Sequence, residues 1–252
     1  MPVLRYKIWA WGGVDSSAGG VSDQYLVGIQ TRAKKGTEET SIYTVPNELI
    51  CCQLGQVLGL PVPTGVVIER NEEAYYASLD FNIEGHNLPP ADTAALARDQ
   101  PFLVCGILAF DAWVVNPDRH SRNLSYSALT SRVYLFDHGH AFLHRDGRAS
   151  LVAAEDQLGI GYHCLADEVR RLDAVWDWMQ RINQVPEYYI RHVVTGAVTA
   201  GLPAEDAEFC ADFLLRRRAK LLDLFRRHRR RFSNAEASLW ESTDEEIIDY
   251  CI

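Results

Sequence analysis

The sequence predicts an α+β protein of two lobes. Stretches rich in β-branched and aromatic residues fill the first third of the 252-residue chain, and long stretches with helical spacing fill the last third. The composition agrees, because 47% hydrophobic and 23% charged residues are values of a globular protein and exclude a disordered or fibrous chain. A cleft between two such lobes is a usual place for a ligand.

The N-terminal lobe, residues 1–81, is expected to hold a small sheet and one helix. The helix is predicted over Asn47–Leu58, where apolar residues recur at helical spacing and Gly59 follows as a stop. The polar stretch 32–41 is expected to be a flexible loop. The predicted strands are Val3–Trp11, Tyr25–Thr31, Gly65–Glu69 and Ala74–Asp80.

The C-terminal lobe, residues 82–252, is expected to be helical with one inserted strand pair. Asp92 is a candidate N-cap for a short helix over Thr93–Arg98. The remaining segments, in chain order, are a buried helix Gln100–Val115, a loop Asn116–Asn123, strands Leu124–Ser127 and Arg132–Phe136, and helices Ala166–Asn183, Pro186–Ala200 and Pro203–Phe232.

Charge and hydropathy exclude several classes of protein. The longest apolar run, Phe102–Val115, is shorter than the ~18–20 residues of a membrane span and contains Asp111. The N-terminus lacks a signal-peptide pattern, and the six cysteines form no CxxC motif or Cys/His cluster, so a reduced, cytoplasmic protein is expected. The net charge of −9 makes broad nucleic-acid binding an unlikely function, because attraction to phosphates needs a positive surface.

One segment departs from this acidic balance. Leu214–Phe232 contains nine Lys and Arg residues against one acid, whereas Ser233–Ile252 contains six acids and no base. Leucines at helical spacing place one face of this basic helix in the core. Its arginine face is either solvated, or paired with the acidic tail, or it docks an acidic partner, RNA or membrane surface.

The residues with chemical potential lie in Asn116–Asn123 (NPDRHSRN). Asp118 precedes Asn123 by five positions in a loop after an apolar helix, and fourteen residues after Asn123 a strand ends in Asp137-His138-Gly139. An Asp–Asn pair alone is usually a turn device. With the strand-ending Asp, the spacing suits phosphoryl transfer, in which one Asp faces a hydroxyl while Asn and Asp oxygens hold Mg²⁺.

NxDRHxxN followed by a strand and DHGxxF resembles the HipA-like kinases, distant relatives of protein and phosphoinositide kinases. Two further segments are similar to that family: NE before LGLPVP within residues 47–63, and FLLRRR at residues 213–218. The resemblance spans residues 10 to 225, approximately, and is closest to compact members of the family. It implies a two-lobed protein-kinase-like fold with a small β-rich N-lobe and a helical C-lobe.

The resemblance also implies roles for the matching residues. Asp118 would be the catalytic base, and Asn123 and Asp137 would be the Mg²⁺ ligands. Glu48 would pair with the ATP-binding lysine, although an acid in the first turn of a helix is also favoured by the helix dipole alone. Three further residues, which would shape the loop, are Asn116, Arg119 and His120.

The ATP-binding lysine is the least regular part of the pattern. The family places it within the strand before the helix, where Gly28 or Gln30 stands in this sequence. Lys34 is the favoured candidate because it lies thirteen residues before Asn47; the other candidates are Lys35 and Lys7.

Further ATP contacts are expected at both ends of the nucleotide. Gly12 and Gly13 begin a glycine-rich loop whose backbone N–H groups would approach phosphates, although the loop is not GxGxxG and suits a plain hairpin equally. Ser16 and Ser17 would add hydroxyl contacts, and either is a candidate for autophosphorylation by resemblance. The adenine is expected near residues 78–81, with Ser78 and Asp80 as contacts.

The expected function is Mg²⁺-dependent transfer of the γ-phosphoryl group of ATP to a hydroxyl, that of a protein Ser/Thr by resemblance. The alternatives are a lipid or small-molecule kinase, a nucleotidyl transferase, and a nucleotide-binding pseudokinase that acts as an interaction module. The pseudokinase is distinguished by the absence of a lysine within salt-bridge distance of Glu48.

Overall fold

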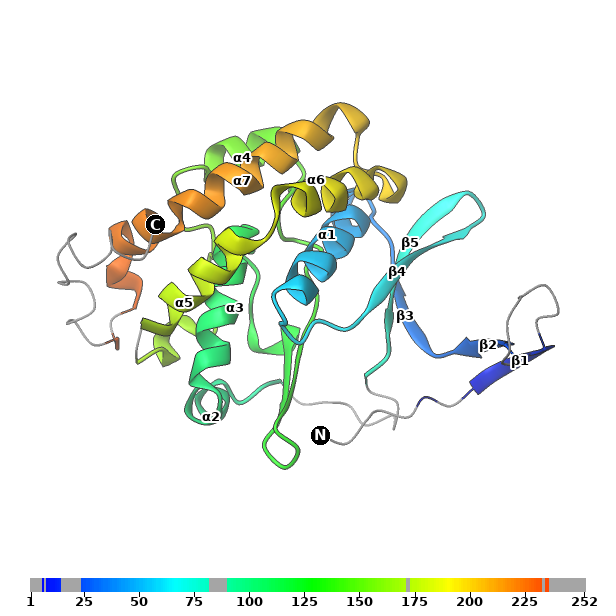
Figure 1. Ribbon diagram of the computed structural model, residues 1–252, viewed down its shortest axis with the longest axis horizontal. Coiled ribbons are helices and arrows are strands. Elements are labelled where there is room, and N and C mark those ends of the chain that lie inside the picture. The colour runs from blue at the N-terminus through cyan, green and yellow to red at the C-terminus, as the bar shows by residue number, and fades with distance from the viewer. Residues whose placement is uncertain are drawn as a thin grey trace.

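The computed structural model describes residues 6, 8–14, 24–81, 90–170, 173–232 and 234–235. Figure 1 shows a smaller part, in which a three-stranded sheet packs beside helix α1 (Thr44–Val57), and a larger part that is mostly helical. The predicted α+β class is confirmed. The lobe boundary at residue 81 stays a prediction.

The three-stranded sheet is antiparallel, with strand order β3 (Thr31–Lys34), β5 (Glu73–Leu79) and β4 (Gly65–Arg70). The predicted loop over 32–41 is wrong in its first three residues, because Thr31–Lys34 pairs residue by residue with Tyr76–Leu79. Backbone pairing with β5 thus makes a strand of a polar, largely exposed sequence that carries no hydrophobic alternation.

A separate two-stranded sheet precedes it, formed by β1 (Ile8–Val14) and β2 (Tyr25–Ile29). The prediction that Gly12 and Gly13 begin a loop is wrong, because both lie within β1. Gly13 has a φ of 83°, which favours glycine, and the pairing is irregular between Trp11 and Gly13. The glycines therefore permit a bulged strand.

The larger part contains six α-helices among the described residues, with α3 buried at its centre against α5 and α7. Asp92 caps α2 as predicted, since its side chain accepts a hydrogen bond from the Ala95 N–H at 3.0 Å. The helices are α2 (Thr93–Asp99), α3 (Pro101–Trp113), α4 (Arg148–Ala154), α5 (Asp173–Gln184), α6 (Glu187–Gly196) and α7 (Ala204–Arg227), and the 3-10 turns are η1 (Ser121–Asn123), η2 (Ala166–Glu168), η3 (Ala197–Ala200) and η4 (Arg229–Arg231).

Two helix predictions need correction. The prediction of a single helix over Ala166–Asn183 is wrong. The turn η2 ends before Val169, whose backbone is extended, and α5 begins at Asp173. The last helix ends at Arg227 instead of Phe232, with η4 as a short continuation. The seven-residue helix α4 lies outside every predicted element, and it is too short to show helical periodicity.

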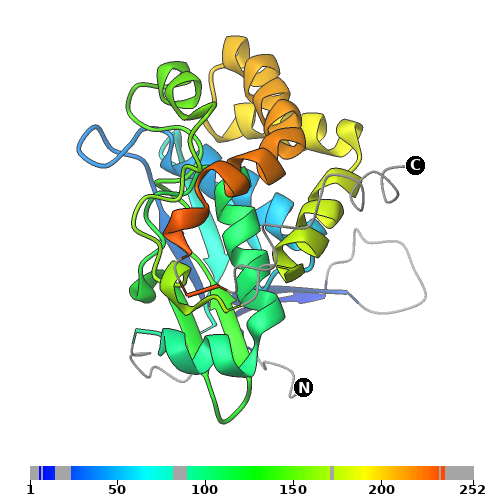
Figure 2. The same cartoon turned by 90° about the vertical axis from the view of Figure 1, so that its left-hand side faces the viewer.

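The inserted strand pair is confirmed as the hairpin of β6 (Leu124–Ser127) and β7 (Arg132–Leu135). It lies at the lower end of the helical part, on the same side as α2, in both views (Figures 1 and 2). No helix in the described part of the chain has the length and apolar character of a membrane span. The cytoplasmic location stays a prediction.

Helix α7 uses several of its cations within the fold. The buried Arg217 donates hydrogen bonds to the carbonyls of Ala112, Ala154, Gln157 and Leu158. Lys220 Nζ lies 2.8 Å from a carboxylate oxygen of Glu155. The docking of an acidic partner on this helix remains a prediction, and the acidic tail from residue 236 onward lies outside the described residues.

Candidate active site

Three charged side chains from separate elements meet at Lys34, the last residue of β3. Lys34 Nζ lies 2.7 Å from Glu48 Oε1 in α1 and 2.8 Å from Asp137 Oδ1 after β7. Of the other candidate lysines, Lys35 pairs with the exposed Glu73 instead, and Lys7 lies outside the described residues. Among the candidate lysines that the structure describes, Lys34 is therefore the one that reaches Glu48.

The ion pairs keep both ends of this contact charged. Burial acts to lower the pKa of Lys34, but the attraction of Glu48 and Asp137 outweighs it and raises that pKa above its ordinary value. Burial acts to raise the pKa of Asp137, but the charge and hydrogen bond of Lys34 outweigh it and lower that pKa. At neutral pH Lys34 is thus a cation and Asp137 an anion.

A cavity of about 450 Å³ opens beside these side chains, between the three-stranded sheet and the end of β7. Ser78 and Asp80 lie in its wall, and their contact with a nucleotide base stays a prediction. Gly12 and Gly13 are not among the lining residues, and Ser16 and Ser17 lie outside the described residues. The lining residues are Arg32, Lys34, Glu48, Val62, Pro63, Tyr76, Ser78, Asp80, Phe81, Phe136, Asp137 and His138.

The loop after α3 is fixed by a buried ion pair. Arg119 Nε lies 2.8 Å from Asp111 Oδ2, and both side chains are fully buried. Asn116 Nδ2 donates to Asp111 Oδ1 at 2.9 Å, and His163 Nε2 lies 3.0 Å from Asp111 Oδ2. Burial acts to raise the pKa of Asp111, but Arg119 and His163 outweigh it and hold that pKa well below its usual range.

Arg119 also links the two predicted Mg²⁺ ligands. Its Nη1 donates to the carbonyl oxygens of Asn123 at 2.9 Å and of Phe136 at 2.7 Å. The Phe136 N–H in turn donates to the Asn123 carbonyl at 3.3 Å, and Asp137 is the next residue. Asp137 has a φ of 62°, a strained value for a residue other than glycine. The guanidinium therefore holds Asn123 beside Asp137.

Sequence reasoning missed Asp111 and His163 as parts of this network. The signal at Asp111 is a single carboxylate within the apolar run Phe102–Val115, since a buried charge requires a partner. No comparable signal exists for His163, which is 52 residues away in the chain.

Asp118 has a partly exposed carboxylate in this loop. Its side chain is 43% exposed and lies 3.9 Å from His120 Nε2. Its backbone is held at both ends, because the Asp118 N–H donates to Asn116 Oδ1 at 3.2 Å and the Asp118 carbonyl accepts from Asn123 Nδ2 at 2.9 Å. A fixed backbone with an open carboxylate suits a residue that meets a substrate.

The donor set suits Mg²⁺ with bound phosphates. The Asn123 amide nitrogen donates to the Asp118 carbonyl, so the amide oxygen is the atom of this side chain that could bind a metal. Asp137 adds a carboxylate that is 40% exposed. No cluster of three His, Cys, Asp or Glu side chains that could hold a metal exists in the described part of the chain. Two oxygen ligands are nevertheless typical of Mg²⁺, which retains waters and binds substrate phosphates.

His138 lies behind this site in the core. Its ring packs edge-on against Phe110, with centroids 5.8 Å apart, and neither ring nitrogen has a hydrogen-bond partner in the described structure. Burial, followed by the charge of Arg119, lowers the pKa of His138 to about 3. The imidazole is therefore neutral, with Nδ1 3.9 Å from Glu48 Oε2.

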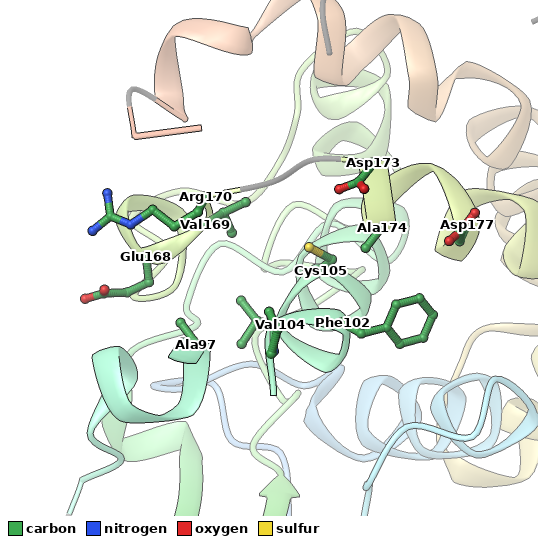
Figure 3. A pocket seen from close by; sticks show the side chains of 11 residues that line it. Ala97, Phe102, Val104, Cys105, Glu168, Val169, Arg170, Asp173, Ala174 and Asp177 are labelled. Carbon is green, nitrogen blue, oxygen red and sulfur yellow. The ribbon is translucent and has the colours of Figure 1, made fainter. Parts of the chain in front are cut away.

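A second cavity, of about 320 Å³, lies between α2, α3 and α5 (Figure 3). Its walls are partly apolar, and Glu168, Asp173 and Asp177 supply three carboxylates against the single cation of Arg170. Such a charge pattern repels a polyphosphate, and none of the predicted site residues lines it. The first cavity is therefore the candidate active site.

Comparison with known proteins finds similar structures but no similar sequence. No family model and no curated protein matches the sequence. Among solved structures, the chain is similar to the Helicobacter pylori proinflammatory kinase CtkA, with a TM-score of 0.60 and 14% identity over 88% of this chain and 95% of CtkA. It is more distantly similar to HipA of Shewanella oneidensis, solved with HipB and operator DNA, with a TM-score of 0.48 and 14% identity over 88% of this chain and 68% of HipA.

The similarity to CtkA establishes the fold. The chain has a two-lobed kinase-like fold, as the motifs predict. Within this fold, the structure brings Lys34, Glu48, Asp137 and Ser78 to one cavity.

Proposed function

We propose that the protein is an ATP- and Mg²⁺-dependent kinase that transfers the γ-phosphoryl group to a hydroxyl, with a protein Ser or Thr as the acceptor. The observation that carries this proposal is the contact of Lys34 with both Glu48 and Asp137 in the wall of the cavity. In kinases a lysine paired with a helix glutamate binds the nucleotide phosphates, and a nearby aspartate holds the metal.

In this proposal Lys34, in the wall of the cavity, binds the phosphates of ATP. Glu48 is 4% exposed and fixes the direction of the lysine side chain. Asn123 and Asp137 would hold Mg²⁺, which neutralises charge on the phosphates when it is bound. Arg119 positions both ligands through the carbonyls of Asn123 and Phe136, so it is a positioning residue.

Asp118 is the group that meets the acceptor. Its open carboxylate orients the hydroxyl and accepts the proton as the oxygen–phosphorus bond forms. Because the transition state of phosphoryl transfer is loose, most of the catalysis comes from position and charge neutralisation. The hydrogen bonds that fix the backbone around Asp118 contribute to the positioning.

The pseudokinase alternative depends on the absence of a lysine at Gly28 or Gln30, where the family places it. The Lys34–Glu48 ion pair of 2.7 Å favours the active kinase over it. The acceptor class comes from the resemblance alone, so lipid and small-molecule hydroxyls are the alternatives that a substrate screen must include.

Two neighbouring lysines provide a matched test. We expect Lys34→Met to abolish transfer of labelled γ-phosphate to a generic Ser/Thr acceptor protein, because the phosphates lose their cation. Lys35→Met removes an equal charge one residue away, where Lys35 pairs with the exposed Glu73, and should retain wild-type transfer. Equal transfer by wild type and Lys34→Met would refute the assignment.

A further inference from the structure

Arg32 lies in the wall of the cavity, and neither the sequence motifs nor the proposed catalysis uses it. It is two residues before Lys34 on β3, and side chains two apart on a strand face the same side. Their partners across the sheet are Ser78 for Arg32 and Tyr76 for Lys34, and both partners line the same cavity. The cavity therefore has two cationic positions along β3.

Asp80 holds Arg32 by one edge. Arg32 Nε lies 2.9 Å from Asp80 Oδ2, and Gln30 Nε2 donates to the same oxygen at 2.7 Å. The Asp80 side chain is 3% exposed, so its charge needs these partners, whereas the Arg32 side chain is 65% exposed. The guanidinium is thus oriented by Asp80 and still accessible. A planar guanidinium stacks well on aromatic rings.

The other walls of this end are flat and apolar. Phe81 and Phe136 lie with ring centroids 5.0 Å apart, and Val62 and Pro63 add aliphatic surface. A planar cation together with aromatic and aliphatic walls suits a flat heteroaromatic ring. A triphosphate attached to that ring would extend toward Lys34.

We propose that Arg32 stacks on the nucleotide base and makes the site prefer purine nucleotides. This inference rests on the proposed function, because it needs a nucleotide in the cavity. Stacking depends on the area of the ring and not on its hydrogen-bonding edge. A purine triphosphate therefore binds more tightly than a pyrimidine triphosphate, and inorganic tripolyphosphate gains nothing from Arg32 stacking.

The test compares the Kd values of Mg²⁺ complexes of ATP, CTP and inorganic tripolyphosphate by calorimetry. We expect wild type to bind ATP about tenfold more tightly than CTP, and Arg32→Lys to lose about tenfold for ATP. Arg32→Lys keeps the charge and the reach to Asp80, so its affinity for tripolyphosphate should stay within about twofold. Arg32→Ala should lose the preference for ATP over CTP as well.

Three outcomes would overturn the role of Arg32, and a fourth would contradict the proposed function. If Arg32→Lys prefers ATP over CTP as strongly as the wild-type protein does, stacking by Arg32 is excluded. An equal loss for ATP and tripolyphosphate would make Arg32 a phosphate-binding charge. Wild-type protein that binds none of the three ligands would contradict the proposed function itself, whereas normal ATP binding by both Arg32 variants would contradict only the role of Arg32.

Discussion

At the residue scale, His138 makes the free energy of unfolding depend on pH in the acidic range. Its pKa is lowered to about 3 in the folded protein, against an ordinary value of 6.5. Between these values the unfolded chain binds the additional proton, so stability is fully present above pH 6.5 and is lost as the pH falls toward 3. The two unpartnered ring nitrogens add a cost at every pH.

Replacement of this ring provides the first prediction. In His138→Leu the free energy of unfolding should fall less steeply below pH 6.5, by up to ~1.4 kcal/mol per pH unit, because the unfolded chain loses the imidazole that is protonated there while the buried ring stays neutral. Denaturant titrations at several pH values measure this slope. His192→Gln, at an exposed position on α6, is the matched control and should retain the wild-type slope. A wild-type slope in His138→Leu would contradict the assigned pKa.

Single residues also show how far sequence reasoning extends. The separation of Lys34 from Asn47 selects it in the sequence, although its polar neighbours predict a loop there. Strand β3 has no apolar alternation, since its pairing with β5 comes from backbone hydrogen bonds that composition does not encode. Gly12 and Gly13 were misplaced for a related reason, because glycine marks a bulged strand as well as a loop.

At the element scale, the Asp111–Arg119 pair joins α3 to the loop and to the start of β6. The loop motif was visible in the sequence, but its anchor was not. Asp111 and His163 come from segments 52 residues apart, and only the tertiary fold places them within 3.0 Å. The same holds for Arg32 and Asp80, which become neighbours through the register of β3 on β5.

This anchor leads to a prediction about stability. Asp111→Asn leaves the fully buried Arg119 without a counter-charge, so we expect a loss of about 3–5 kcal/mol in the free energy of unfolding. Asp146→Asn removes an exposed carboxylate from the loop before α4 and should change stability by less than about 0.5 kcal/mol. Chemical denaturation compares the two variants. A cost as small as that of the control would show that Asp111 does not anchor the loop.

At the scale of the whole molecule, the site depends on contacts between distant parts of the chain. Lys34 and Asp137 are 103 residues apart and lie within 2.8 Å of each other across the cavity. The two-lobed fold could be predicted from motifs because DRHxxN and DHG lie close together in the sequence. Their separation, fourteen residues from Asn123 to Asp137, suits a kinase. The cavity wall around Ser78 could be predicted only as a segment, because the lining residues come from the sheet, from α1 and from the segment after β7.

We propose that Asp118, Asn123 and Asp137 form a phosphoryl-transfer site together with Lys34. Intact mass spectrometry of the full chain after incubation with Mg²⁺ and ATP tests it most directly, with Asp118→Asn as the inactive variant and Asp146→Asn as the control. We predict that wild type and Asp146→Asn gain the mass of one or more phosphoryl groups, and that Asp118→Asn gains none. An adenylyl group added instead, or an unmodified wild-type protein, would contradict the account.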